Sequence, residues 1–403
     1  MELVFYLFSC LMLFLIWKRF RDYLHPAFIT IIIWFLIVFS YNYLIRKTNL
    51  WISLSDGFYF ILISYIFVFC LFAGYFSLQK TRGSSIEIVP FGLKHKFFLY
   101  VSIICLSISN IYYIKLIGSV GFNLLREETD FGKSLPFFVK LCSYFMQPGI
   151  IVFFLGIMRE QNRKKYKFPL FILAIMIIIS FFTSMNKGGF FQLAVCIFYF
   201  LKINNNLNRK TFFILAIVFL SLVLTLQFLR SGTETSKDNF FLRFLYVYFL
   251  SPAPAFDAVI SGSKKLHSNY FGCWTLSFFY RFFNKLGLID VLPTELLKSQ
   301  KWIGVPYATN VYTMPGNFYI DYGFMGILLC ALLYGGIFGK IYSRIRYKNS
   351  ISNKIFYSLY LYCLVFQFFG DWFFSFFSVT LQTIFWLFFL TNKFKVYGLR
   401  SRI

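Results

Sequence analysis

Four arginines lie in connecting segments on the side of the chain's topology where the short loops hold few Lys and Arg residues. They are Arg126, Arg230, Arg243 and Arg281. A guanidinium group binds phosphate through a planar pair of N–H donors, so arginine is a common ligand of diphosphates. Arg230 stands where a long apolar run ends, at the depth where a lipid diphosphate would lie. The alternative is an ordinary interfacial arginine whose charge extends towards water.

Carboxylates and one histidine share these segments. Asp257 lies inside an apolar stretch, and Asp321 precedes a Gly-Phe-Met-Gly sequence. A carboxylate or an imidazole can remove the proton of a hydroxyl while a new bond forms to its oxygen, so Asp257, Asp321 and His267 are candidate general bases. Asp321 is equally well placed to cap the next helix, and a single loop histidine is usually solvated. We interpret Asp371 as a polar turn between two apolar runs.

Amide and phenol side chains gather just before the ninth apolar run. They are Asn310, Tyr312, Asn317 and Tyr319. Such groups bind sugar hydroxyls and stack on sugar faces, although interfacial anchoring by tyrosine is the alternative. The three histidines are far apart and the eight cysteines show no paired spacing, so the sequence predicts no metal site. It contains no glycine-rich motif that would predict a cofactor.

Composition indicates what holds these residues in place. The chain has 403 residues, of which 59% are hydrophobic and 14% charged, and its mean hydropathy is +0.69. A soluble domain is about half apolar and about a quarter charged, so these values indicate an integral membrane protein. The net charge of +25 does not indicate nucleic-acid binding, because most positive residues fall in alternate short loops.

Eleven apolar runs divide the chain. Most are near the length that crosses about 30 Å of hydrocarbon, and their apolar residues are continuous rather than periodic. We therefore expect an all-α polytopic membrane protein with about eleven transmembrane helices. The runs cover approximately residues 3–17, 26–45, 58–78, 97–117, 136–157, 168–185, 190–203, 211–229, 324–338, 355–370 and 372–390.

The charges of the loops predict the orientation. Lys and Arg residues favour the loops that follow the odd-numbered runs, which places the N-terminus outside and the C-terminus inside. Helices 1–8 then occupy residues 1–229, one large outside loop covers 230–322, and helices 9–11 with a basic tail occupy 323–403. Within the loop, residues 240–260 are apolar but interrupted by Pro252 and Pro254, which predicts a short or re-entrant helix.

Two short motifs lead to a family resemblance. Thr309-Asn-Val-Tyr-Thr313 is followed by Tyr319-Ile-Asp-Tyr-Gly323 and Gly326, and single arginines follow the fourth and eighth runs. With about eleven spans and one large outside loop, this pattern resembles the O-antigen (oligosaccharide repeat unit) polymerases of the Wzy type. The resemblance implies a GT-C-like, metal-independent glycosyltransferase in a bacterial inner membrane, with its active face in the periplasm.

The resemblance also implies a reaction. Repeat units linked to undecaprenyl diphosphate would be joined by moving the growing glycan from its lipid carrier onto the next lipid-linked unit. Arg230 and Arg126 would hold the diphosphate, while Asp257, Asp321 or His267 would orient or deprotonate the acceptor hydroxyl. The remaining substrate-binding residues would be Arg243, Arg281, Asn310, Tyr312, Asn317 and Tyr319. The implied partners are membrane lipid, a polysaccharide chain-length regulator and a flippase.

Two other functions fit part of the pattern. An O-antigen ligase, which transfers finished glycan to a lipid A core, shares the architecture, although the two motifs favour a polymerase. A flippase or another transporter of lipid-linked oligosaccharide would predict charges within the spans and two similar halves. The runs here are nearly free of charge, and the halves differ in loop length.

Overall fold

The computed structural model describes all residues except 49, 80–90, 128–134, 159, 185–186, 204–207, 232–239, 265, 267, 269, 291, 293–302, 306 and 392–403. The described residues form helices joined by mostly short connections. They also contain one antiparallel two-stranded sheet, made by β1 (Ile303–Gly304) and β2 (Ala308–Thr309). The prediction of a helical chain is confirmed, apart from this small sheet.

Contacts divide the chain into two compact units, each assembled from separate segments. Unit 1 contains Met1–Ser84, Thr235–Lys348 and Tyr360–Thr380, and unit 2 contains Ser85–Glu234, Asn349–Leu359 and Leu381–Ile403. Helices α16 (Ile351–Val365) and α17 (Phe377–Thr391) pass from one unit into the other. The predicted segments 1–229, 230–322 and 323–403 follow chain order and stay a prediction.

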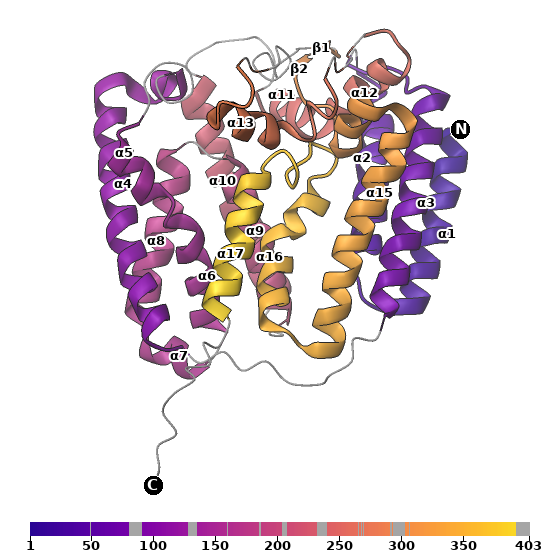
Figure 1. The fold of residues 1–403 in the computed structure, drawn as a ribbon. Helices are drawn as coiled ribbons and strands as arrows, with labels where there is room; N and C mark the ends of the chain where they lie inside the picture. The colour runs from indigo at the N-terminus through magenta and orange to yellow at the C-terminus, as the bar shows by residue number, and fades with distance from the viewer. Residues whose placement is uncertain are drawn as a thin grey trace. The chain divides into compact units, whose positions relative to one another are not determined.

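Long helices make up most of unit 1 and run side by side (Figure 1). Two of them begin at a residue whose side chain caps the helix. The His25 ring accepts the Ala27 N–H at 3.2 Å, and the Ser55 hydroxyl accepts the Phe58 N–H at 3.2 Å, so both residues cap helix starts. The elements are α1 (Glu2–Phe20), α2 (Pro26–Ser40) with its π-helical continuation η1 (Tyr41–Ile45), α3 (Asp56–Leu78) and α15 (Met314–Lys348).

Shorter elements of unit 1 lie at one end of these helices, at the top of Figure 1. They are α11 (Phe240–Leu245), the π-helix η3 (Tyr246–Leu250), α12 (Pro252–Ile260), α13 (Ser277–Lys285) and the small sheet. Residues 240–260 are thus helical in three pieces, with the break before α12 at Ser251. Their entry into a membrane stays a prediction.

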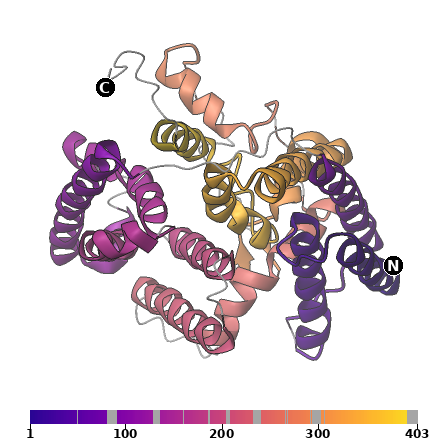
Figure 2. The same cartoon turned by 90° about the horizontal axis from the view of Figure 1, so that it is seen from below.

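Close packing of two glycines holds α15 against α3. A Cβ atom on Gly335 would lie 2.7 Å from the Phe69 carbonyl oxygen, and one on Gly339 would lie 2.7 Å from the Ala73 carbonyl oxygen. Small residues one turn apart let helix backbones approach in this way, which favours association by van der Waals contact inside a membrane. Figure 2, a view from below, shows α15 beside α3.

Unit 2 contains the middle helices of the chain. Asn110 joins two of them, because its side-chain N–H donates to the Met176 carbonyl oxygen at 3.1 Å and its oxygen accepts from the Ser180 hydroxyl at 2.8 Å. The helices are α4 (Leu93–Glu127), α5 (Phe137–Ser143), α6 (Met146–Ile157), α7 (Glu160–Lys165), α8 (Lys167–Thr183), α9 (Lys187–Ile203) and α10 (Arg209–Ser231).

Several helices are long and apolar enough to cross a membrane. Among the described residues, six meet this criterion, and four shorter apolar helices accompany them. Every one of the eleven apolar runs contains helix, so the chain is a multi-pass helical membrane protein. The number of eleven spans and the orientation stay predictions. The tenth and eleventh runs differ from expectation, because residues 366–376 between α16 and α17 are irregular rather than helical.

Candidate functional site

A pocket of about 450 Å³ in unit 1 brings together residues from three separate parts of the chain. One wall comes from α13 and the turn before it, one from the start of α15, and one from the irregular segment before α17. Aromatic rings alternate with amides, hydroxyls, one arginine and one aspartate. The lining residues are Cys273, Trp274, Ser277, Phe278, Arg281, Asn310, Val311, Tyr312, Asn317, Phe369, Gly370, Asp371, Trp372, Ser375, Phe376 and Ser378.

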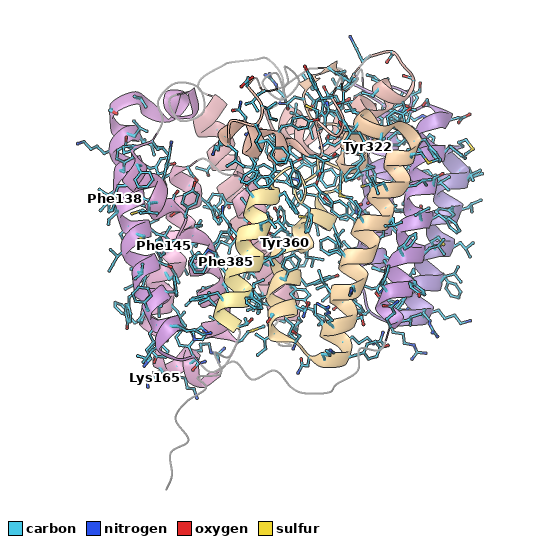
Figure 3. The ribbon with its side chains drawn as sticks, viewed as in Figure 1. Phe138, Phe145, Lys165, Tyr322, Tyr360 and Phe385 are labelled. Atoms are coloured by element: carbon cyan, nitrogen blue, oxygen red, sulfur yellow. The ribbon has the colours of Figure 1, made fainter. Side chains whose placement is uncertain are left out.

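Asp321 fixes the wall that carries Trp274. Its carboxylate accepts the backbone N–H groups of Trp274 at 3.1 Å and Thr275 at 2.8 Å. It also accepts the Thr275 hydroxyl at 2.8 Å. The hydroxyl of the next residue, Tyr322, lies 3.1 Å from the Thr275 hydroxyl. Tyr322 stands where α15 meets the short elements (Figure 3). The sequence predicted a general base or a helix cap at Asp321. In the structure its carboxylate holds the 272–276 turn by hydrogen bonds, and its role as a base stays a prediction.

A kink in α15 lets Asp321 form these hydrogen bonds to the 272–276 turn. Gly323 has φ +61° and ψ −147°, a conformation that side chains disfavour. A Cβ atom on Gly326 would lie 2.0 Å from the carbonyl oxygen of Phe318. The Tyr319–Gly326 motif therefore shapes the backbone that presents Asp321 and Tyr322 to the preceding turn.

The second wall is fixed by the start of α15. Thr313 has φ +71°, and its hydroxyl caps the helix by accepting the Gly316 N–H at 3.0 Å. The Met314 N–H donates to the Gln367 carbonyl oxygen at 2.7 Å, which joins this wall to the third one. As a result Asn317, in the first turn of α15, lines the pocket. The Tyr312 ring stands nearly perpendicular to Trp274, with 5.8 Å between the ring centroids.

The third wall turns around Asp371, which is 4% exposed. Its Oδ1 atom accepts the N–H groups of Phe373 at 3.0 Å and Phe374 at 2.9 Å, together with the Tyr334 hydroxyl. Burial raises the pKa of the Asp371 carboxyl to about 6, against the opposing effect of the hydrogen bonds from Tyr334 and the backbone amides. The predicted polar turn is present, but its aspartate also lines the pocket.

Three buried polar atoms of pocket-lining residues have no well-formed hydrogen bond within the described structure. They are Oδ2 of Asp371 and the indole Nε1 atoms of Trp274 and Trp372. Buried polar groups are nearly always hydrogen-bonded, so such a group in a native protein calls for an explanation. One acceptor and two donors around a pocket match a ligand that carries several hydroxyl groups.

Arg281 supplies a positive charge to the same pocket. It is exposed on α13, and no carboxylate lies within 4 Å of it among the described residues. Four predicted binding residues thus share this pocket: Arg281, Asn310, Tyr312 and Asn317. No three His, Cys, Asp or Glu side chains in the described part of the chain are grouped so that they could hold a metal ion.

Three other predicted residues lie in unit 1 outside the pocket lining. Asp257 on α12 accepts the Ser55 N–H at 3.0 Å and the Ser55 hydroxyl, which ties α12 to the start of α3. Burial raises the pKa of the Asp257 carboxyl, and the hydrogen bonds from Ser55 lower it in part. Arg243 lies 5.7 Å above the Tyr307 ring, and Tyr319 packs edge-on against Phe256.

The remaining predicted residues have side chains that the structure does not describe. Arg126 stands in α4 and Arg230 in α10, both in unit 2, and His267 lies outside the described residues. Their roles stay predictions. Sequence reasoning passed over Trp274 and Trp372 and gave Asp371 only a turn. Two signals were available: a tryptophan in the long loop and another at the start of the eleventh apolar run, and an acidic residue between two apolar runs.

The fold defines a multi-pass helical membrane protein, and its unit 1 contains an aromatic, polar pocket. Over 384 residues the chain is 25% identical to a protein of Escherichia coli (strain K12) named "Putative O-antigen polymerase", and the match covers 90% of each chain. This similarity agrees with the resemblance drawn from the motifs. No protein-family model and no solved structure matches the chain.

Proposed function

We propose that the protein polymerises O-antigen repeat units at the periplasmic face of a bacterial inner membrane. It transfers the growing glycan from undecaprenyl diphosphate onto a sugar hydroxyl of the next lipid-linked unit. The observation that carries this proposal is the pocket, in which aromatic rings, two amides and one carboxylate surround a space of about 450 Å³. The similarity to the named polymerase over 90% of the chain supports the same function.

The pocket has the composition that a sugar site needs. Trp274, Trp372 and Tyr312 offer ring faces and edges, which pack on the C–H faces of sugars. Asn310 and Asn317 offer both donors and acceptors to hydroxyl groups. Lined by these groups, the pocket binds a glycan by ring contacts and hydrogen bonds.

The departing diphosphate requires positive charge. In the transfer, an acceptor oxygen bonds to the anomeric carbon while the bond from that carbon to the diphosphate oxygen breaks, and the electron pair leaves with the diphosphate. Arg281 is the described arginine at the pocket, and its guanidinium, which has no carboxylate within 4 Å among the described residues, stabilises that charge. For Arg230 and Arg126, predicted from the sequence to bind the diphosphate, we propose the same role.

Complementation in cells tests the function. A strain that lacks this chain is supplied with the wild type or with Asn317→Ala, and the lipopolysaccharide is separated on a gel. We expect a ladder from the wild type, and single-repeat glycolipid from the empty strain and from a normally inserted Asn317→Ala protein. Long glycan that accumulates on its carrier in the empty strain would instead identify a ligase. Loss of all outward-facing glycan would identify a flippase.

A further inference from the structure

Asp371 differs from the other two predicted or described carboxylates near the site. Both oxygens of Asp321 accept hydrogen bonds from the 274–275 turn, and both oxygens of Asp257 accept from Ser55. In Asp371, the turn amides and Tyr334 all donate to Oδ1. Oδ2 is buried and receives no well-formed hydrogen bond within the described structure. One oxygen therefore holds the turn, and the other is a buried acceptor in a residue that lines the pocket.

Two indole N–H groups lack an acceptor, just as Oδ2 of Asp371 lacks a donor. Trp274 and Trp372 line the pocket with Asp371, and each has a buried Nε1 that lacks an acceptor within the described residues. A sugar hydroxyl can donate one hydrogen bond and accept others, so a single bound sugar can satisfy a carboxylate oxygen and an indole donor together. The three groups come from segments about a hundred residues apart, and the fold gathers them at one pocket.

We propose that Asp371 is the general base of the transfer, and that Trp274 and Trp372 orient the acceptor sugar whose hydroxyl it deprotonates. This inference rests on the proposed polymerase function. The acceptor O–H donates to Oδ2, and its proton moves to this oxygen as the acceptor oxygen bonds to the anomeric carbon. The bond to the diphosphate breaks with its electron pair, and the proton later leaves Asp371 for solvent. Tyr334 is a positioning residue, because it holds Oδ1.

The Asp371→Asn variant isolates the proposed step. An asparagine keeps a carbonyl oxygen that can accept from the Phe373 and Phe374 amides and from Tyr334, so the turn is retained. The change replaces only the second oxygen, which becomes an N–H₂ donor that cannot accept a proton. The matched control is Asp290→Asn, which makes the same change at an exposed aspartate outside the pocket lining.

The experiment measures initial rates of glycan elongation by purified full-length protein in liposomes that contain lipid-linked repeat units. We expect kcat of Asp371→Asn to fall about 100-fold or more, the scale of a lost general base, while KM changes less than about threefold. Asp290→Asn should match the wild type. The amount of folded protein and its unfolding temperature separate a base from a structural residue, because misfolding lowers both, whereas loss of a base lowers kcat in a protein that folds normally.

Each outcome decides the proposal. If the wild type elongates glycan and the kcat of Asp371→Asn is within about threefold of the wild-type kcat, Asp371 is not the base. The polymerase function then stands. Absence of elongation by the wild type overturns the polymerase function itself. Where Asp371→Asn fails to fold, the wild-type pH profile tests the base, since a rate that does not fall as pH drops through about 6 overturns it. Trp372→Phe then tests the orienting role, because it removes one indole N–H and keeps an aromatic ring. We then expect a raised KM for the acceptor, and an unchanged KM overturns the orienting role.

Discussion

The carboxylate of Asp321 accepts the Thr275 N–H and the Thr275 hydroxyl, each at 2.8 Å, across 46 residues of chain. This contact joins the head of α15 to the turn that carries Trp274. It gives the Tyr319–Gly323 motif a physical role, since Asp321 of this motif holds in place the wall of the pocket that carries Trp274.

Loss of the Asp321 hydrogen bonds to the 274–275 turn should destabilise the protein. Asp321→Ala leaves two backbone N–H groups and one hydroxyl without their acceptor, and each such group costs about 1–3 kcal/mol when buried. We expect a lower unfolding midpoint in detergent and loss of elongation. Asp290→Ala, at an exposed position, is the control. Equal midpoints for the two variants would show that the Asp321 contacts contribute little.

The kink in α15 should tolerate no side chain at Gly326. The Cβ atom of Gly326→Ala would lie 2.0 Å from the Phe318 carbonyl oxygen, so the backbone has to move. Gly74→Ala on α3 adds a Cβ that meets no atom within 4 Å, and it serves as the control. We expect Gly326→Ala to lower both the yield of folded protein and its unfolding temperature, with Gly74→Ala near the wild type. The reverse order would contradict the kink.

Arg281 should contribute through its charge. Arg281→Ala removes the pocket cation, and we expect kcat/KM for lipid-linked substrate to fall about tenfold or more, with a smaller loss for Arg281→Lys. Lys285→Ala is the control, because Lys285 is an exposed cation on the same helix and does not line the pocket. Equal losses for Arg281→Ala and Lys285→Ala would point to a general surface-charge effect.

Elongation should depend on pH through Asp371. Only the ionised carboxylate accepts a proton, and its pKa is about 6, so the rate should fall as pH falls through about 6. The Tyr334 hydroxyl lowers this pKa, so Tyr334→Phe should shift the midpoint upward. The other groups that interact with Asp371 are Tyr65 on α3, Cys330 on α15, and Tyr362 and Cys363 on α16. A wild-type profile that is flat between pH 5 and about 7 would contradict this assignment.

The same shift has a consequence for stability. The folded state holds the Asp371 proton more tightly than the unfolded chain does, because burial raises the pKa. The carboxyl therefore contributes stability at acid pH that is lost as pH rises through about 6. Asp371→Asn should flatten the rise of unfolding temperature towards acid pH, which a thermal scan at several pH values measures. An identical pH dependence in both proteins would exclude Asp371 as its source.

The sequence predicted what depends on composition and local pattern. Long apolar runs must become helices in lipid, because every backbone polar group needs an internal partner there, and each run contains helix, although residues 366–376 are irregular. Polar and charged residues are uncommon in so apolar a chain, which is why the sequence singled out four residues that line one pocket. They are Arg281, Asn310, Tyr312 and Asn317. Their roles in binding stay predictions.

The roles of Asp257 and Asp371 depend on contacts with residues far away in the sequence, which the sequence pattern could not predict. Asp257 looked like an isolated carboxylate in an apolar stretch, yet its partner Ser55 lies 202 residues away. Asp371 looked like a turn, and only the fold shows that it reaches a pocket with Trp274, a residue almost a hundred positions earlier. Spacing along one chain carries no signal for such pairs. The side chains of Arg126, Arg230 and His267 lie outside the described part, so their predicted roles rest on the sequence.

Reconstitution tests the central claim most directly. Purified wild-type protein in liposomes receives lipid-linked repeat units as its only glycan, and both products are followed with time. We expect a ladder spaced by one repeat, all of it carried on lipid diphosphate, with one undecaprenyl diphosphate released for each linkage formed. No ladder and no released diphosphate, or transfer that occurs only after a lipid A core is added, would contradict the account.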